Sequence, residues 1–423
     1  MARRHFGTDG VRGVVGVDLT PELVERLGKA AALWSKAGRI FVGRDTRGSG
    51  PELEEAFARG IVSAGGAAVL GGILPTPAVA LLALDLGAVI SASHNPPEYN
   101  GVKLFDHDGR KLSDAAEEEL EALMDGPLIP RAIAGEIDEV GVATDSYLEH
   151  VIDRFGSDLS GLRIAVDCAN GAYSGIAPKA FIDLGASITT VGDQPDGSNI
   201  NVGCGATDLR TLQHSVTSGG YDLGIAFDGD GDRMLAVDEN GDPVDGDQIV
   251  ALLALHLGVD LVAVTAMTNL GFHRLMAERG IRVVTTDVGD RYVLEALRRE
   301  GGLLGGEQSG HIIYLKDHVT GDGLAAALLL CSALEGRTLS EAAAVMPRYP
   351  QAKENVPVRT KKLTPALETE IARVNAELGD RGRVLVRPSG TEPVVRVLAE
   401  AKTDAETESL CATIAALVRR ELG

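Results

Sequence analysis

Short apolar runs typical of β-strands alternate with helix-like segments along most of this 423-residue chain. Near the N-terminus, strands are predicted at 39–43, 67–70 and 87–90, with helices at 51–64 and 77–86 between them. Strands separated by helices cannot pair as tight hairpins, so they pair side by side through crossover connections. The alternation therefore predicts α/β domains built on parallel or mixed sheets.

The same alternation restarts twice further along the chain. Strands are predicted at 163–167, 187–191 and 222–227 in a second region, and at 261–265 and 282–285 in a third. Helical segments again lie between them, and no sequence repetition is detectable. The chain therefore contains three consecutive α/β units of similar size.

The C-terminal part follows another pattern. A helix near 366–378 is followed by strands at 383–387 and 394–399 and by a closing helix, which favours a small α+β domain. A chain of this length is too long for one ordinary core. We predict an α/β protein of four domains, three with mixed α/β sheets and the last α+β, at 1–143, 144–240, 241–347 and 348–423.

Composition argues against several classes of protein. The formal net charge of −21 disfavours nucleic-acid binding, because nucleic-acid binders carry clustered positive charge. Four scattered cysteines without CxxC spacing argue against a zinc cluster and a disulfide framework; they are Cys168, Cys204, Cys331 and Cys411. No uninterrupted apolar stretch reaches the length of a membrane span, and no signal-type segment follows Met1. We expect a cytoplasmic protein without nucleic-acid or membrane partners.

The segment SASHNPP at 91–97 places a serine directly after a strand predicted to be buried. Ser93 follows the carboxyl end of that strand, where parallel α/β sheets bind their ligands. A serine hydroxyl needs a base, a metal or a reactive acceptor to act as a nucleophile, and His94 and Lys103 are the nearest candidates. An Asn-Pro turn with a solvated Ser-His pair is the alternative interpretation.

Three aspartates alternate with glycines directly after the strand at 222–227; they are Asp228, Asp230 and Asp232. Carboxylates at this spacing can converge on one hard cation, and oxygen ligands suit Mg²⁺. An EF-hand calcium loop ending at Glu239 is the competing interpretation. Arg233 stands where that loop needs glycine, and the flanking segments look like strands. We therefore predict a magnesium site, with an acidic solvated turn as the remaining alternative.

A glycine-flanked loop, GGEQSGH at 305–311, offers a carboxylate, an amide, a hydroxyl and an imidazole. Glu307, Gln308, Ser309 and His311 can hydrogen-bond several neighbouring hydroxyls or amines, which is what a sugar presents. A polar turn with a satisfied histidine explains the same residues equally well.

Two further loops contain arginines that suit a phosphate. The first is a candidate clamp of two strand arginines around a Ser-Gly-Thr loop with free N–H groups and hydroxyls. Its residues are Arg387, Ser389, Gly390, Thr391 and Arg396. A hairpin with exposed arginines is the alternative.

The second loop, FGTDGVRG at 6–13, lacks P-loop spacing and does not predict nucleotide binding, although its Arg12 could meet a phosphate.

The serine turn, the three-aspartate loop, the Gly-Glu-x-Ser-Gly-His loop and the Arg-x-Ser-Gly-Thr clamp, in this order, resemble the α-D-phosphohexomutase superfamily from end to end. FGTDGVRG, SASHNPPEYNGVKLF, GGEQSGH and RPSGTEP are most similar to its members that act on amino sugars. Gln308 and Asp290-Arg291 favour the same group, because relatives acting on mannose and glucose phosphates typically carry methionine and histidine there.

The resemblance implies four domains around a central cleft, with a phosphoryl group on Ser93 and one Mg²⁺ per subunit. The implied metal ligands are Ser93, Asp228, Asp230 and Asp232. Glu307 and Ser309 are implied to hold sugar hydroxyls, and the clamp residues to hold the phosphate that is not reacting. Candidates for proton transfer, charge stabilisation and positioning at the reacting phosphate are Arg12, His94, Lys103, Arg233 and His311, with no ranking among them.

The implied reaction converts glucosamine 6-phosphate reversibly into glucosamine 1-phosphate through a 1,6-bisphosphate, feeding UDP-N-acetylglucosamine and peptidoglycan precursors. Mannose or glucose phosphates are alternative substrates. A non-catalytic, metal-dependent sugar-phosphate binder is the alternative from another class. Glucosamine or glucose 1,6-bisphosphate is a candidate activator. The sequence leaves open whether the chain forms a homodimer, and whether a kinase or a bisphosphate first phosphorylates Ser93.

Overall fold

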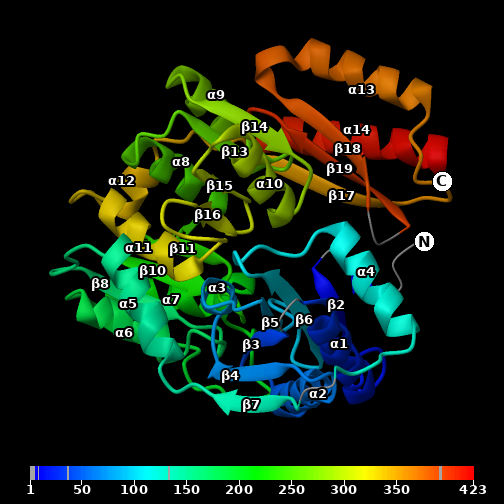
Figure 1. The fold of residues 1–423 in the computed structure, drawn as a ribbon. Coiled ribbons are helices and arrows are strands. Elements are labelled where there is room, and N and C mark those ends of the chain that lie inside the picture. Colours follow the sequence, from blue (N-terminus) through cyan, green and yellow to red (C-terminus); the bar gives the residue numbers. More distant parts are fainter. Residues whose placement is uncertain (1–4, 8, 36–37, 132–133, 390–392) are drawn as a thin grey trace. The chain divides into compact units, whose positions relative to one another are not determined.

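A computed structural model describes residues 5–7, 9–35, 38–131, 134–389 and 393–423, and Figure 1 shows their helices and strands. The chain divides into two compact units. The first consists of Met1–Ala266 and Val283–Ala344, and the second of Met267–Arg282 and Val345–Gly423. None of the described helices combines the length and the apolar character needed to cross a bilayer.

The N-terminal sheet of the first unit has the strand order β1-β2-β6-β5-β3-β4-β7. Its strands are β1 Phe6–Gly7, β2 Gly10–Val14, β3 Arg39–Arg44, β4 Ala67–Ile73, β5 Leu86–Ile90, β6 Tyr99–Asp106 and β7 Glu136–Glu139. Strands β5, β3, β4 and β7 are parallel, whereas β6 is antiparallel to both β5 and β2. The turn between β5 and β6 is too short for a crossover helix, so β6 returns beside β5.

The helices of this region are α1 Pro21–Trp34, α2 Gly50–Ser63, α3 Thr76–Leu81 and α4 Asp114–Asp125. Apolar side chains of α1, α2 and α4 share one buried core with β3 and β5; they include Leu27, Phe57, Leu120, Ile40 and Ile90. The helix predicted at 77–86 is shorter than expected, because Leu86 already begins β5. The glycine-rich segment at 6–13, expected as a loop, includes the antiparallel strands β1 and β2.

A second sheet has the order β12-β11-β10-β8-β9. Its strands are β8 Arg163–Asp167, β9 Ser187–Val191, β10 Leu223–Phe227, β11 Met234–Asp238 and β12 Pro243–Val244. The accompanying helices are α5 Ala143–Phe155, α6 Ile176–Asp183, the 3₁₀ turn η1 Gly205–Thr207 and α7 Arg210–Gly219. Strands β10 and β11 form an antiparallel hairpin, so the loop between them has no EF-hand helices, in agreement with the prediction.

A third sheet has the order β14-β13-β15-β16. Its strands are β13 Leu261–Thr265, β14 Arg282–Thr286, β15 Leu304–Gly306 and β16 Ile312–Tyr314. The remaining helices of the first unit are α8 Gly246–His256, α10 Asp290–Glu300, α11 Gly323–Ala333 and α12 Leu339–Ala343. Strands β15 and β16 are antiparallel, and the loop that joins them is the glycine-flanked loop singled out in the sequence.

The C-terminal unit contains an antiparallel sheet in the order β17-β19-β18. Its elements are α9 Leu270–Glu278, β17 Gln351–Pro357, α13 Pro365–Leu378, η2 Gly379–Arg381, β18 Arg383–Pro388, β19 Val394–Glu400 and α14 Asp404–Leu422. The sheet shares its core with α13 and α14, as the α+β prediction requires. The earlier segment carrying α9 joins this unit through bonds such as Asn269 Nδ2 to Tyr349 O and Leu270 N–H to Glu400 Oε1, at 2.9 and 3.0 Å.

Candidate active site

Ser93 lies in the turn between β5 and β6. Its φ of +52° is a left-handed value that is uncommon for a residue with a side chain. The Ser93 hydroxyl donates to Asp228 Oδ2 at 2.6 Å and lies 3.2 Å from His94 Nδ1. The turn thus presents the hydroxyl to the aspartate loop of the second sheet.

The predicted aspartates converge on the hairpin between β10 and β11. Asp228, Asp230 and Asp232 are buried, and one carboxylate oxygen from each lies within 4.8 Å of the others. Gly229 between them has to be glycine, because a Cβ there would lie 2.7 Å from the carbonyl oxygen of Ser93. The backbone of the serine turn therefore packs directly against the backbone of the aspartate loop.

The aspartate cluster fits a divalent cation. Asp230 Oδ1 and Asp232 Oδ1 are buried and accept no hydrogen bond from the described residues. Burial, followed by the charges of Asp230 and Asp232, raises the pKa of Asp228 well above its usual range. A cation would reduce the repulsion among the three carboxylates and would bind the two oxygens that accept no hydrogen bond. A donor set made only of oxygens suits Mg²⁺.

Lys103 on β6 supplies a counter-charge to this cluster. Its Nζ lies 2.6 Å from Asp230 Oδ2, 3.2 Å from Asp232 Oδ2 and 3.4 Å from Asp9 Oδ2. Burial alone would lower the pKa of Lys103, but the carboxylates outweigh it and raise the pKa. Lys103 is therefore a fixed positive charge at neutral pH and not a base in this state.

A second ion-pair network involves the third sheet. Lys111 Nζ lies 2.6 Å from Asp9 Oδ1 and 2.6 Å from Asp290 Oδ2. His311 Nε2 lies 3.5 Å from the same Asp290 oxygen, and His311 Nδ1 lies 3.7 Å from Asp232 Oδ1. Burial opposes protonation of His311, but Asp290 and Asp232 outweigh it and raise the pKa. Charged groups associated with all three sheets thus meet beside the aspartate loop.

Two arginines and a histidine complete the surroundings of the serine. Arg12 pairs with Asp9, and the backbone N–H of Arg233 donates to Asp228 Oδ1 at 3.1 Å. The Nε atoms of both arginines are buried and donate to none of the described residues, so each can donate to an added anion. Burial, with the charges of Arg233 and Arg12, lowers the pKa of His94 to about 4. His94 is therefore neutral at pH 7.

The glycine-flanked loop between β15 and β16 contributes mainly Glu307. Its Oε1 accepts from the Gly289 N–H at 3.1 Å, and burial raises its pKa. Ser309 is exposed. Gln308 Nε2 donates to Asp245 Oδ2 at 3.4 Å, so this side chain contacts the N-terminal cap of α8.

The predicted phosphate clamp lies in the C-terminal unit. Arg387 and Arg396 are directly opposite each other across β18 and β19, so the two strands bring two guanidinium groups to one place. Lys361 Nζ donates to the carbonyl oxygen of Ser389 at 2.9 Å and adds a third cation that the sequence analysis missed. Gly390 and Thr391 lie outside the described residues.

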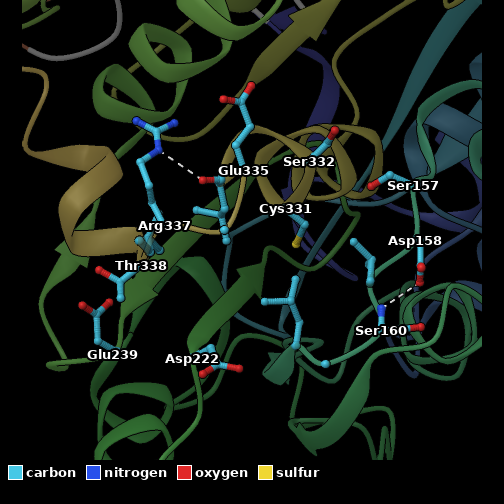
Figure 2. Close-up of a pocket in the computed structure, with 16 residues that line it drawn as sticks. Ser157, Asp158, Ser160, Asp222, Glu239, Cys331, Ser332, Glu335, Arg337 and Thr338 are labelled. Atoms are coloured by element: carbon cyan, nitrogen blue, oxygen red, sulfur yellow. Dashed lines mark hydrogen bonds between the residues drawn. The ribbon is translucent and has the colours of Figure 1, made fainter.

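A cavity of about 600 Å³ elsewhere in the first unit does not belong to this site (Figure 2). It lies between the loop that follows α5 and the connection of α11 to α12. The charged residues lining it are Asp158, Asp222, Glu239, Glu335 and Arg337. Because carboxylates outnumber the guanidinium there, the cavity is unsuited to a sugar phosphate.

Five charged residues of the site were not predicted from the sequence: Asp9, Lys111 and Asp290, which pair with predicted residues, and Asp45 and Arg47, beside the serine turn. For the last two a signal existed. They directly follow β3, which is parallel to β5, so the carboxyl ends of the two strands lie side by side. Asp9 lies within the segment FGTDGVRG, and Asp290 precedes Arg291 in a pair already noted for its resemblance. Their shared contact with Lys111 could not be predicted, because the three residues are far apart in the sequence.

The ion pairs of Lys111 predict an acid-sensitive fold. The pKa of Asp9 and that of Asp290 are lowered because the neighbouring lysines outweigh burial. Lowered values stabilise the fold above the unfolded pKa near 3.8, and the stabilisation is lost as the pH falls below it. We expect Lys111→Met to reduce the loss of unfolding free energy between pH 5 and 3 by about 1 kcal/mol, mainly through Asp290, because Asp9 keeps Lys103 and Arg12 as neighbours. Urea denaturation at each pH measures this, and Lys179→Met, an exposed lysine, should match the parent; an unchanged acid slope in Lys111→Met would contradict the prediction.

Comparison with known proteins yields matches over the whole chain. Four models of phosphoglucomutase/phosphomannomutase match in order: α/β/α domain I at 3–127, domain II at 145–241, domain III at 245–349 and the C-terminal domain at 343–417. The phosphoglucosamine mutase of Moorella thermoacetica is 49% identical, over 96% of this chain and 97% of that protein. The phosphoglucosamine mutase of Geobacillus thermodenitrificans is 46% identical over 99% of each.

Solved structures show the same fold. A phosphoglucomutase/phosphomannomutase family protein from Burkholderia thailandensis has a TM-score of 0.84 and 26% identity, over 98% of this chain and 95% of that one. The N-acetylphosphoglucosamine mutase of Aspergillus fumigatus, solved with GlcNAc-6P and magnesium, has a TM-score of 0.73 and 21% identity over 99% and 96%. The predicted four-domain α/β class is thereby confirmed.

Proposed function

The chain belongs to the phosphoglucomutase/phosphomannomutase family, and from this premise we propose that it interconverts glucosamine 6-phosphate and glucosamine 1-phosphate. The near-full-length similarity to two phosphoglucosamine mutases supports the amino sugar as substrate. The observation that carries the chemistry is the 2.6 Å contact of Ser93 Oγ with Asp228 in a buried carboxylate cluster. The domain boundaries 1–143, 144–240, 241–347 and 348–423 stay part of this proposal.

Asp228, Asp230 and Asp232 are the proposed ligands of one Mg²⁺ per subunit, together with the phosphate of phospho-Ser93. The unmatched Oδ1 atoms of Asp230 and Asp232 support this assignment, and the A. fumigatus enzyme of the same fold was solved with magnesium. When bound, the metal would neutralise the carboxylates and polarise the transferring phosphoryl group.

In the proposed reaction, phospho-Ser93 transfers its phosphoryl group to the 1-hydroxyl of glucosamine 6-phosphate. The bond from phosphorus to Ser93 Oγ breaks, a bond to the sugar oxygen forms, and the hydroxyl proton ends on Ser93 Oγ. Neutral His94, 3.2 Å from that oxygen, is suited to relay the proton. Arg12, Arg233 and Lys103 would stabilise the negative charge of the phosphoryl group.

The resulting 1,6-bisphosphate then turns over and returns its 6-phosphoryl group to Ser93. Glu307 and Ser309 would hold hydroxyls that both orientations present. The phosphate that is not reacting would be held by Arg387, Ser389, Gly390, Thr391 and Arg396, with Lys361 as an added cation. His311 would lie close to the reacting phosphate, where Asp290 and Asp232 outweigh burial and raise its pKa.

The clamp can be tested separately from the chemistry. We expect Arg396→Ala to raise KM about 10- to 100-fold while kcat falls less, because a charge-assisted contact to phosphate is lost. Steady-state kinetics measure both constants, with Arg381→Ala, an arginine outside the clamp, as the control. A KM equal to the parent value would remove Arg396 from the proposed clamp.

The substrate is tested by ³¹P NMR of the protein with Mg²⁺ and a trace of glucose 1,6-bisphosphate. Glucosamine 6-phosphate, mannose 6-phosphate and glucose 6-phosphate are supplied in parallel. Fastest formation of the 1-phosphate from the amino sugar supports the proposal. Faster conversion of mannose or glucose phosphate would change the substrate but keep the mechanism, and no conversion of a sugar phosphate by the bisphosphate-primed protein would favour a binding protein.

Activation, assembly and location are also proposals. A sugar 1,6-bisphosphate or a kinase would first phosphorylate Ser93, and intact mass before and after each treatment distinguishes them. A homodimer is proposed as the assembly, which light scattering tests. A cytoplasmic location suits a soluble hexosamine phosphate as substrate, and cell fractionation tests it.

A further inference from the structure

Arg47, between β3 and α2, has its guanidinium fully buried and fully hydrogen-bonded. Its side chain has no exposed surface, and a guanidinium has five N–H donors. The five bonds run from Nε to Asp45 Oδ2 at 2.9 Å, from Nη1 to Pro96 O at 2.5 Å and Tyr99 O at 2.9 Å, and from Nη2 to Ser93 O and Asn95 O, both at 2.8 Å. No donor remains for a substrate phosphate.

The four carbonyl groups bound by Arg47 all belong to the 93–99 turn, which carries the reactive hydroxyl. Inward-pointing carbonyl groups repel one another unless a donor lies between them. A planar guanidinium presents donors in several fixed directions, whereas a lysine ammonium is a point charge with three donors. The turn is therefore built around a residue that lysine cannot replace.

Asp45 connects both peptide groups of Ser93 to one carboxylate. Asp45 Oδ2 accepts from Arg47 Nε and, at 2.6 Å, from Ser91 Oγ. The Ser91 hydroxyl in turn accepts from the Ser93 N–H at 2.9 Å. The N–H of Ser93 is thus fixed through Ser91, and its carbonyl group through Arg47.

The loop between β9 and η1 contributes one more bond to the same carbonyl group. Asn201 Nδ2 donates to Ser93 O at 2.9 Å. With both peptide groups of Ser93 fixed, its left-handed φ of +52° is held against the intrinsic preference of a residue with a Cβ. That backbone conformation places the hydroxyl 2.6 Å from Asp228.

We propose that Arg47 is a positioning residue for phosphoryl transfer. It acts through the backbone of the 93–99 turn and holds Ser93 Oγ against the aspartate loop. This inference rests on the proposed function, because it concerns the serine that carries the phosphoryl group. A displacement of about 1 Å at a reacting atom can lower the rate by two orders of magnitude. This sets the expected effect of losing the hydrogen bonds that Arg47 donates to the turn.

The test compares Arg47→Lys with Arg44→Lys, the same replacement three residues earlier. Arg44 Nε pairs with Glu54 Oε2 at 3.0 Å and Arg44 Nη1 donates to the backbone oxygen of Asp45 at 3.5 Å, and neither bond involves the 93–99 turn. We expect Arg47→Lys to lower kcat about 100-fold with KM within threefold of the parent. Hydrogen exchange of the 91–99 amides should become about 10-fold faster while the rest of the first unit is unchanged. Arg44→Lys should stay within twofold of the parent in both measurements.

Two results would overturn the inference: a kcat for Arg47→Lys close to the parent value, or faster exchange spread over the whole first unit. If Arg47→Lys does not fold, Asp45→Asn decides, because it keeps the guanidinium but weakens its orientation. About a 10-fold lower kcat with faster exchange at 91–99 supports the proposal, and parent values for Asp45→Asn refute it. A parent protein that converts none of the sugar phosphates refutes the proposed function, while the exchange comparison still decides whether Arg47 fixes the turn.

Discussion

Ser93→Ala is expected to lower mutase turnover by about 10⁴-fold or more, because alanine has no oxygen to carry the phosphoryl group. The change removes the hydroxyl that donates to Asp228 at 2.6 Å and leaves the neighbouring charges in place. Sugar-phosphate binding should therefore persist. Turnover is measured by ³¹P NMR with Mg²⁺ and bisphosphate, binding by calorimetry, and the phosphate on the protein by intact mass.

The control for this variant is Ser309→Ala, which changes a serine of the glycine-flanked loop. Since Ser309 is proposed to hold a sugar hydroxyl, its loss should raise KM and leave the phosphate on Ser93. A Ser93→Ala protein that still converts glucosamine 6-phosphate, or that still carries the phosphate after bisphosphate treatment, would disprove the assignment of Ser93.

Lys103→Met is expected to lower the unfolding free energy by about 3–5 kcal/mol in the absence of divalent cations, as breaking a buried ion pair does. Lys103 Nζ contacts Asp230, Asp232 and Asp9, and these carboxylates would keep their burial without its charge. Mg²⁺ can replace part of that charge, so we expect Mg²⁺ to stabilise the variant more than the parent. Urea denaturation in EDTA and in Mg²⁺ measures both effects.

Lys111→Met provides the matched control for Lys103→Met. Lys111 is equally an ion-paired lysine, but its partners are Asp9 and Asp290, which lie outside the proposed metal ligands. Its variant should lose stability without the extra gain from Mg²⁺. Equal gains for the two variants would contradict the idea that Lys103 and the metal share the same carboxylates.

The residues that sequence analysis identified are those whose signal is local. Ser93 and Asp228 each follow a strand within a few positions, and a strand end is recognisable from hydrophobicity and turn residues. The strand β7 escaped prediction because its sequence, Glu-Ile-Asp-Glu, is polar and exposed at a sheet edge, so neither apolar run nor alternation marks it. Polar edge strands are common because they discourage further pairing.

The contacts between distant charges could not be predicted in the same way. Lys111 contacts Asp290, although the two residues are far apart in the sequence. Only the packing of the first sheet's region against that of the third brings them together. A single sequence shows that each residue is charged but not which charges face each other. Arg47 illustrates the opposite case, because its neighbourhood followed from the parallel pairing of β3 and β5 once that pairing was assumed.

The discontinuous path of the chain has a consequence for biosynthesis. The segment Met267–Arg282, which carries α9, leaves the ribosome before the residues it bonds to. The N–H of Leu270 donates to Glu400, and the side-chain amide of Asn269 donates to the carbonyl oxygen of Tyr349. These bonds at the start of α9 cannot form until the C-terminal part of the chain has been synthesised. A nascent or truncated chain that stops at residue 344 leaves this segment without its partners. The C-terminal unit therefore cannot be removed or exchanged by dividing the chain at a single position.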